Sequence, residues 1–277
     1  MMTGKIVVAT GATSGVGAAA VEALARQGAR IVFVARDPAR AEATRARLDA
    51  VAPALGHKAY FADLSLIAQT KRVGAEIATA EPRIDVLINN AGALFATRRL
   101  TAEGLEASFA LNHMSYFVLT AALRESLAEA RGRIVSTASA AHRGARLDFD
   151  DLQSAKIAPG FRVYGRSKLC NILFTRELAR RWAGTGVTAN CVHPGVVASR
   201  FGDEAGGWTT PLFKLVKRFA ISPQQGADTI VWLASSPDVA DVSGQYFARR
   251  KPGALSRAAQ DDAAARRLWE ASEKLAV

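Results

Sequence analysis

Short apolar runs alternate with longer amphipathic stretches through the first two-thirds of the chain. The runs are mostly apolar rather than alternating, which is typical of strands covered by helices on both faces of a sheet. Alternation of this kind indicates βαβ units and a parallel sheet. The strands that we expect are Lys5–Thr10, Arg30–Ala35, His57–Ala62, Ile84–Asn89, Arg133–Ala138, Val187–His193 and Gly244–Phe247.

The stretches between these runs place apolar residues every three or four positions, as amphipathic helices do. The helices that we expect are Val16–Gln27, Ala39–Ala50, Leu66–Ala80, Thr101–Ala128 with a break near Asn112, and Arg162–Ala183. The chain is therefore predicted to be α/β: a single Rossmann-like doubly wound domain over residues 1–277. We expect a seven-stranded, mainly parallel sheet flanked by helices.

Two long connections interrupt this rhythm. His142–Phe161 lies between a strand and a helix, and Ser199–Pro223 follows the sixth strand. Both exceed the usual connection of roughly two to six residues. Open α/β sheets bind ligands at the carboxyl ends of their strands. We therefore expect both stretches to contact substrate, with 199–223 as a lid.

Length and composition agree with one α/β domain. The chain has 277 residues, of which 49% are hydrophobic. No apolar run reaches the roughly 18 residues of a membrane-spanning helix, and Met1–Val8 lacks the pattern of a signal peptide. Cys170 and Cys191 lack metal-ligand spacing, as do the scattered histidines, so we expect no metal and a reducing, cytoplasmic compartment.

The formal net charge of +11 raises the question of an anionic partner. The arginines are spread over many helices, which is typical of solvated helix faces, so we expect no nucleic acid. The segment Trp208–Ile221 is basic and amphipathic, which would also suit contact with a membrane surface. We favour a lid over an apolar small-molecule substrate.

A glycine-rich segment follows the first expected strand. Lys5–Gly17 reads KIVVATGATSGVG, with its glycines spaced Gly-x3-Gly-x-Gly. Glycine lets the backbone approach a pyrophosphate, whose charge is favoured by free amides at a helix N-terminus. A tight turn without a ligand is the alternative. The residues expected to meet the phosphates are Gly11, Thr13, Ser14, Gly15, Val16 and Gly17.

The residue at the tip of the second expected strand distinguishes the two nicotinamide dinucleotides. An acidic residue there binds the ribose 2′-hydroxyl of NAD, whereas arginine accommodates the 2′-phosphate of NADP. Arg36 holds this position, and Asp37 followed by Pro38 is typical of a helix N-cap. We favour NADP(H), with NAD(H) as the alternative.

Asp63 follows the third expected strand and has two interpretations. Its carboxylate would accept a bond from the adenine amino group, or it would cap the helix that begins near Leu66. Ser65 is the other candidate cap. We favour the adenine contact.

Tyr164 and Lys168 lie four residues apart in VYGRSKLCNILF and share one helix face. A phenol with a pKa of about 10 is a poor acid–base group at neutral pH. A neighbouring ammonium stabilises the phenolate and lowers that pKa. The pair predicts acid–base chemistry, although YxxxK alone also fits a surface pair on an amphipathic helix.

This pair belongs to a longer series of motifs. The series contains, in order, TGATSGVG (10–17), NNAG (89–92), Asn112 in LNHMSYF, Ser139 in RIVSTAS, YGRSK (164–168) and HPGVV (193–197). Together these motifs resemble the short-chain dehydrogenase/reductase family over nearly the whole chain. Four further segments resemble its retinol-dehydrogenase-like branch: STASAAH (136–142), DLQ (151–153), SKLCNILFTRELARR (167–181) and VSGQYF (242–247).

The resemblance implies a role for each catalytic candidate. Tyr164 would donate a proton to the carbonyl oxygen in reduction, while Lys168 would hold the nicotinamide ribose and lower the tyrosine pKa. Ser139, rather than Ser136, would hydrogen-bond the substrate oxygen. Asn112 would support a water that relays protons to Lys168.

The resemblance also implies the remaining cofactor contacts. Asn90 and Gly92 would lie against the cofactor, and the Pro194 turn and Val197 would meet its carboxamide. Ser199 stands where the family usually has threonine, so the hydroxyl is retained. The further contacts on this interpretation are Asp63, Leu64, Ala91, Tyr164 and Lys168.

The sequence thus predicts an NADP(H)-dependent oxidoreductase that moves a hydride between nicotinamide and a carbonyl or alcohol carbon. The branch resemblance implies a small hydrophobic aldehyde, ketone or alcohol as substrate. The alternative is a protein of the same fold that binds or senses NADP(H) without turnover. The resemblance further implies a homodimer or homotetramer formed through Thr101–Ala128 and Arg162–Ala183.

Overall fold

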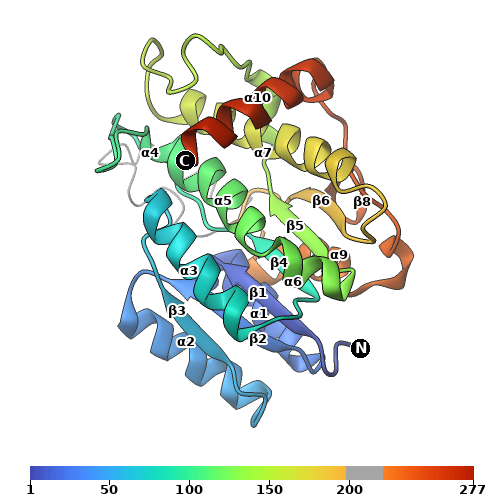
Figure 1. Ribbon diagram of the computed structural model, residues 1–277. Coiled ribbons are helices and arrows are strands. Elements are labelled where there is room, and N and C mark those ends of the chain that lie inside the picture. Colours follow the sequence, from blue (N-terminus) through green and yellow to red (C-terminus); the bar gives the residue numbers. More distant parts are fainter. Residues whose placement is uncertain (198–220) are drawn as a thin grey trace.

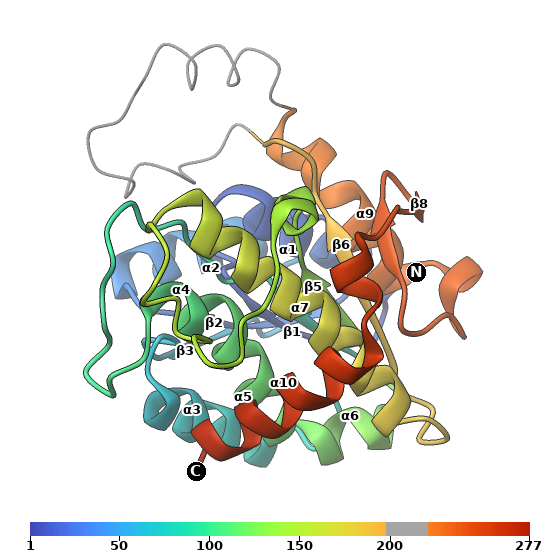
Figure 2. The same cartoon turned by 90° about the horizontal axis from the view of Figure 1, so that it is seen from above.

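A central sheet lies between two layers of helices in the computed structural model, which describes residues 1–197 and 221–277 (Figure 1, Figure 2). In this sheet the strand order is β3-β2-β1-β4-β5-β6-β7-β8, and only the β7–β8 pair is antiparallel. The strands are β1 (Ile6–Thr10), β2 (Arg30–Ala35), β3 (Lys58–Phe61), β4 (Val86–Asn89), β5 (Arg133–Thr137), β6 (Thr188–His193), β7 (Tyr246–Ala248) and β8 (Lys251–Pro252).

This order confirms the predicted doubly wound fold. β1 has β2 on one side and β4 on the other, so the winding direction reverses beside β1. Within the described ranges the sheet has eight strands, one more than the seven predicted. The additional strand is β8, whose two residues fold back on β7. So short a strand leaves no apolar run in the sequence.

Two helix layers bury the two faces of the sheet. The helices are α1 (Gly15–Arg26), α2 (Pro38–Val51), α3 (Ile67–Ala80), α4 (Ala107–Phe109), α5 (Ser115–Ala122), α6 (Arg124–Ala130), α7 (Phe161–Arg181), α9 (Pro223–Ser235) and α10 (Asp262–Leu275). Apolar side chains of α1, α2 and α9 pack with Val7 on one face, and those of α3, α5, α7 and α10 pack with Val8 on the other. Because neighbouring strand residues point to opposite faces, both must be apolar.

The predicted helix Thr101–Ala128 is divided in the structure. Its break near Asn112 is confirmed, because a π-helical turn (Ala110–Met114) separates α4 from α5. A second break at Leu123 separates α5 from α6. Helices α9 and α10 were not among the predicted elements.

The capping predictions have mixed outcomes. Asp37 caps α2 as predicted, since its carboxylate accepts a bond from the Arg40 amide, and Pro38 begins the helix. The alternative interpretation, in which Asp63 or Ser65 caps α3, does not hold, since no side chain of the N-cap residue Leu66, of Asp63 or of Ser65 bonds the first amides of α3. The Glu103 carboxylate instead accepts bonds from the first two amides of α3, at 2.6 and 2.9 Å. Such a partner, distant in the sequence, leaves no local capping signal.

The predicted lid at 199–223 lies almost entirely outside the described residues, and so does Ser199. At its borders, the Ile221 amide donates to the Val196 carbonyl at 2.9 Å, and Ser222 caps α9. None of the helices in the described ranges has both the length and the hydropathy needed to cross a membrane.

Candidate active site

The predicted site residues gather at one edge of the sheet, because parallel strands end their runs on the same side. Gly11 follows β1, Arg36 follows β2, Asn90 follows β4, and Pro194 follows β6, while Ser139 lies two residues beyond β5. The winding direction reverses between β1 and β4. Ligands of doubly wound sheets bind at such a reversal.

The turn between β1 and α1 has the shape of an anion cradle. Gly11 and Gly15 have φ values of +64° and +55°, which side chains disfavour. A Cβ on Gly17 would lie 2.1 Å from the Gly11 carbonyl oxygen, so only glycine fits. Ser14 precedes the helix without a side-chain capping bond, which leaves the first amides of α1 for an anion. These features fit a dinucleotide pyrophosphate.

Asn90 fastens this turn to the neighbouring strands. Its Nδ2 donates to the Gly11 carbonyl at 3.2 Å, and its Oδ1 accepts from the Thr137 hydroxyl at 3.0 Å. The Thr10 hydroxyl accepts the amides of Asn90 and Ala91, both at 3.0 Å. Asn90 therefore shapes the turn through its side chain. Sequence analysis missed Thr10 and Thr137, whose contacts join strands distant in the sequence.

Arg36 and Asp63 stand at the ends of β2 and β3. Arg36 is exposed and forms no ion pair with any described residue, so its charge is available to a phosphate. The Asp63 carboxylate accepts from the amide and hydroxyl of Ser65, at 3.0 and 2.7 Å. Contact of Asp63 with adenine stays a prediction.

Tyr164 lies in the first turns of α7 and faces Ser139. Its side chain is 7% exposed, and the hydrogen bond between these two side chains acts to lower the tyrosine pKa. The Ser139 oxygen also accepts the Ala141 amide at 3.2 Å, which caps the short 3-10 helix Ala140–Gly144. The turn role and the contact with Tyr164 therefore coexist in Ser139. The competing serine, Ser136, is fully buried within β5.

Lys168 is buried beside the tyrosine. Its Nζ lies 5.7 Å from the centroid of the Tyr164 ring and donates to the Thr137 carbonyl at 2.9 Å. Burial lowers the pKa of Lys168 to about 7 and raises that of Tyr164 above its usual value of 10. For Tyr164, desolvation outweighs the hydrogen bond with Ser139, which acts to lower the pKa. The expected lowering of this pKa by Lys168 stays a prediction.

Asn112 connects the π turn to both sides of the site. Its Oδ1 accepts the Ala93 amide at 2.9 Å, and its Nδ2 donates to the Ala93 carbonyl and the Ser167 hydroxyl, also at 2.9 Å. Ser167 in turn donates to the Tyr164 carbonyl at 2.8 Å. Sequence analysis assigned no role to Ser167, although it lies in the YGRSK motif.

Gly92 lies directly against this network. A Cβ at this position would be 3.0 Å from Asn112 Oδ1 and 3.4 Å from Lys168 Nζ. The backbone of Gly92 therefore lies close to both polar groups, with little room for a side chain. This placement agrees with the expected contact between Gly92 and a cofactor, which stays a prediction.

The connection 142–161, predicted to contact substrate, is anchored to the protein over its middle. The Asp151 carboxylate accepts the amides of Ala155 and Lys156 at 2.7 and 3.0 Å, and Arg166 donates to the Asp151 carbonyl at 3.1 Å. Gln153 accepts the Glu106 amide at 2.7 Å. The DLQ motif thus ties this connection to α7 and to the start of α4.

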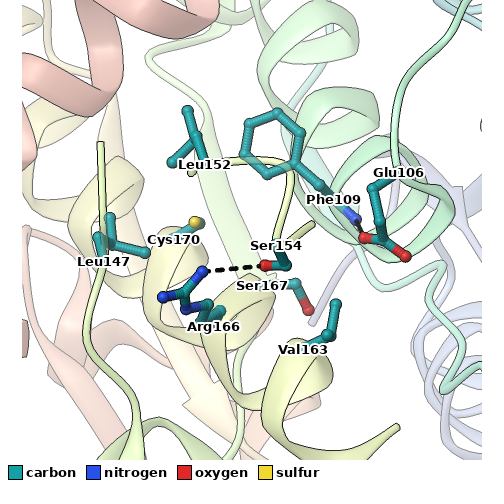
Figure 3. A pocket seen from close by; sticks show the side chains of 9 residues that line it. All are labelled: Glu106, Phe109, Leu147, Leu152, Ser154, Val163, Arg166, Ser167 and Cys170. Carbon is teal, nitrogen blue, oxygen red and sulfur yellow. Dashed lines mark hydrogen bonds between the residues drawn. The ribbon is translucent and has the colours of Figure 1, made fainter. Parts of the chain in front are cut away.

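A small cavity lies under this anchored connection (Figure 3). Val163, Ser167 and Cys170 of α7 line it, with Phe109 and Leu152 opposite. These α7 positions share one helix face, and Tyr164 and Lys168 lie on another. The cavity therefore lies on a different face of α7 from Tyr164 and Lys168, and Ser167, which lines it, accepts a hydrogen bond from Asn112.

A glycine cradle and a buried tyrosine–lysine pair at one edge of a doubly wound sheet are the arrangement of a nicotinamide-dependent dehydrogenase. Residues 5–209 match the family described as short chain dehydrogenase. Retinol dehydrogenase 14 from Mus musculus is 40% identical over 99% of this chain and 86% of its own length. Retinol dehydrogenase 13 from Homo sapiens is 39% identical over 98% of this chain and 84% of its own length.

The chain therefore belongs to the short-chain dehydrogenase family, whose members are oxidoreductases of alcohol and carbonyl groups. Its resemblance to the retinol dehydrogenase branch is confirmed.

Solved structures support the same fold. A protein from Mycobacterium paratuberculosis has a TM-score of 0.79 and 29% identity, covering 99% of this chain and 94% of that one. A short chain dehydrogenase from Burkholderia cenocepacia, solved in complex with NADP, has a TM-score of 0.70 and 26% identity. It covers 94% of this chain and 99% of its own.

Proposed function

We propose that this protein is an NADP(H)-dependent oxidoreductase that reduces hydrophobic aldehydes or ketones and oxidises the corresponding alcohols. The observation that carries the proposal is the placement of Tyr164. Its buried phenol shares a hydrogen bond with Ser139 and lies beside Lys168, at the sheet edge that holds the glycine cradle.

The protonation state of Tyr164 suits carbonyl reduction. The phenol carries a proton at neutral pH, since its ordinary pKa is about 10 and burial raises it. It would donate this proton to a carbonyl oxygen, with the Lys168 ammonium stabilising the phenolate that forms. The Ser139 hydroxyl would donate to the same oxygen as negative charge develops there. A bound nicotinamide cofactor would supply the hydride.

Arg36 is the basis for proposing NADP(H) over NAD(H). Its exposed charge follows β2 and pairs with no carboxylate among the residues that the structure describes, which suits a 2′-phosphate. Arg36→Ala should raise the KM for NADPH much more than the KM for NADH. Equal effects on both would remove this assignment.

The substrate class rests on relatives and on one exposed aromatic ring. Several relatives are named retinol dehydrogenases, after an apolar alcohol. Phe161 is 66% exposed, and its ring centroid lies 6.3 Å from that of Tyr164. An apolar substrate would cover this ring and gain burial from it.

A panel of aldehydes and ketones of increasing apolar size, run with NADPH and NADH in parallel, tests the proposal. We expect the rate of NADPH oxidation to increase with the apolar size of the carbonyl substrate. The alternative, a protein that senses NADP(H) without turnover, would instead bind NADPH and oxidise it with none of them.

A further inference from the structure

The C-terminal helix α10 reaches the turn that carries Asn112. α10 packs on α5 and α7, where the Trp269 ring centroid lies 4.9 Å from that of Phe117 and 5.9 Å from that of Phe174. Further along α10, the fully buried Ser272 places its Oγ 2.8 Å from Nε2 of His113. His113 follows Asn112 directly in the π turn.

The hydrogen bonds around Ser272 fix the tautomer of His113. The serine hydroxyl has one proton, which it donates to the Leu268 carbonyl at 2.8 Å. Its oxygen therefore accepts from His113, whose proton must sit on Nε2. Nδ1 is buried without a partner among the described residues. Burial lowers the His113 pKa to about 3, so the ring stays neutral.

Ser272 is the polar anchor of this ring. The other neighbours of His113 include two aromatic rings, those of Phe109 at 5.1 Å and Phe174 at 6.1 Å between centroids. The adjacent Asn112 has different partners, the Ala93 carbonyl and the Ser167 hydroxyl. The consecutive side chains of His113 and Asn112 thus connect the π turn to α10 on one side and to Ala93 and Ser167 on the other.

We propose that Ser272 is a positioning residue, which through His113 holds the π turn where Asn112 must lie. The inference rests on the proposed function, because Asn112 matters for turnover only if the site is catalytic. Ser272 would act at a distance, without touching substrate or cofactor. Displacing reacting or supporting groups by on the order of 1 Å can cost about a hundredfold in rate.

Ser272→Ala removes the acceptor and leaves a buried N–H on His113. We expect a roughly tenfold lower kcat for carbonyl reduction with an unchanged KM for NADPH. Ser272→Thr keeps the hydroxyl and should keep kcat. Leu268→Ala is the matched control, since Leu268 is 1% exposed on the same helix. It should lower Tm and leave kcat near the wild-type value.

The double variant Ser272→Ala/His113→Phe separates positioning from stability. Removing both partners eliminates the unsatisfied buried donor, so Tm should recover. If Ser272 positions Asn112, kcat stays low although Tm recovers. Recovery of kcat together with Tm, or an equal loss of kcat in Leu268→Ala, would overturn the proposal.

Hydrogen exchange of the amides at 110–114 tests the same idea without turnover. We expect faster exchange in Ser272→Ala than in Leu268→Ala when both are compared with wild type, and equal exchange would overturn the proposal. A wild-type protein that reduces no carbonyl would contradict the proposed function, while this exchange result would still decide the role of Ser272.

Discussion

Burial shifts the proton affinities of Tyr164 and Lys168 in opposite directions. Desolvation disfavours each charged form, so the phenol holds its proton more tightly and the ammonium less tightly. Lys168 nevertheless donates to the Thr137 carbonyl. Both shifts have the same physical cause, the removal of these side chains from water.

Lys168 should make stability depend on pH. Its pKa is about 7 in the folded chain against an ordinary value of 10.5, so between these values the unfolded state binds more protons. Stability contributed by this group therefore rises with pH across that window. Urea unfolding of the wild type and Lys168→Met at pH 7 and pH 9 measures the effect. Between pH 7 and pH 9 the free energy of unfolding should rise more in the wild type than in Lys168→Met. An equal change in both proteins would contradict the pKa shift.

Gly17 should be irreplaceable in the anion cradle. Gly17→Ala would force its Cβ against the Gly11 carbonyl, which distorts the turn that fits the pyrophosphate. We expect the Kd for NADPH to rise at least roughly tenfold, or about 1.4 kcal/mol, in a fluorescence titration. Gly144→Ala is the control, because a Cβ there meets nothing within 4 Å. Unchanged affinity in the Gly17 variant would remove the cradle from the binding site.

The sequence motifs identified the candidate groups but not how they are held. The motifs predict Asn112, Ser139, Tyr164 and Lys168, and the structure brings these four residues to one edge of the sheet. The residues that hold these groups in place could not be predicted, because they make their contacts through backbone atoms and small hydroxyls. One of these is the Thr137 carbonyl, which accepts from both Lys168 and Asn171, and any residue type would supply it.

At the scale of elements, apolar runs predicted the buried strands well because both faces of the sheet are covered. The pattern failed where tertiary contacts decide. The π turn (Ala110–Met114) was visible only as a break, and α3 receives its cap from Glu103. α10 is amphipathic, but the residues directly before it show no strand pattern. It was therefore not predicted as the helix of a βαβ unit.

The contact between Glu103 and α3 predicts a measurable stabilisation. Glu103→Ala removes a carboxylate that accepts two amides at the helix start. We expect the free energy of unfolding to fall by about 1 kcal/mol, the usual cost of a lost cap. Glu103→Gln keeps one acceptor oxygen and should lose less. Denaturant unfolding measures both, and no loss in the alanine variant would show that the cap contributes nothing.

For the whole molecule, the positive charge is dispersed and partly paired. Arg30 pairs with Glu81 at 2.6 Å and Arg176 with Asp262 at 2.8 Å, on separate parts of the surface. Dispersed charge gives weak, salt-sensitive attraction to polyanions. We expect no retention on a DNA column at physiological ionic strength. Retention that survives such salt would contradict this interpretation of the +11 charge.

The helices α5 and α7 offer less exposed surface for a homo-oligomer interface than the sequence predicts. α10 covers part of α5 and α7, with Trp269 packed on Phe117 and Phe174. A dimer or tetramer through these helices would have to use the faces that α10 leaves open. The expected homo-oligomer stays a prediction, which light scattering of the full chain would test.

The central claim is that Tyr164 protonates a carbonyl oxygen in an NADPH-dependent reduction. The most direct test compares kcat of the wild type and Tyr164→Phe on the best carbonyl of the panel, with NADPH binding measured in parallel. We expect kcat to fall by about 10²- to 10⁴-fold while the affinity for NADPH stays within a few-fold of wild type. A phenylalanine variant that keeps near-normal kcat would contradict the account.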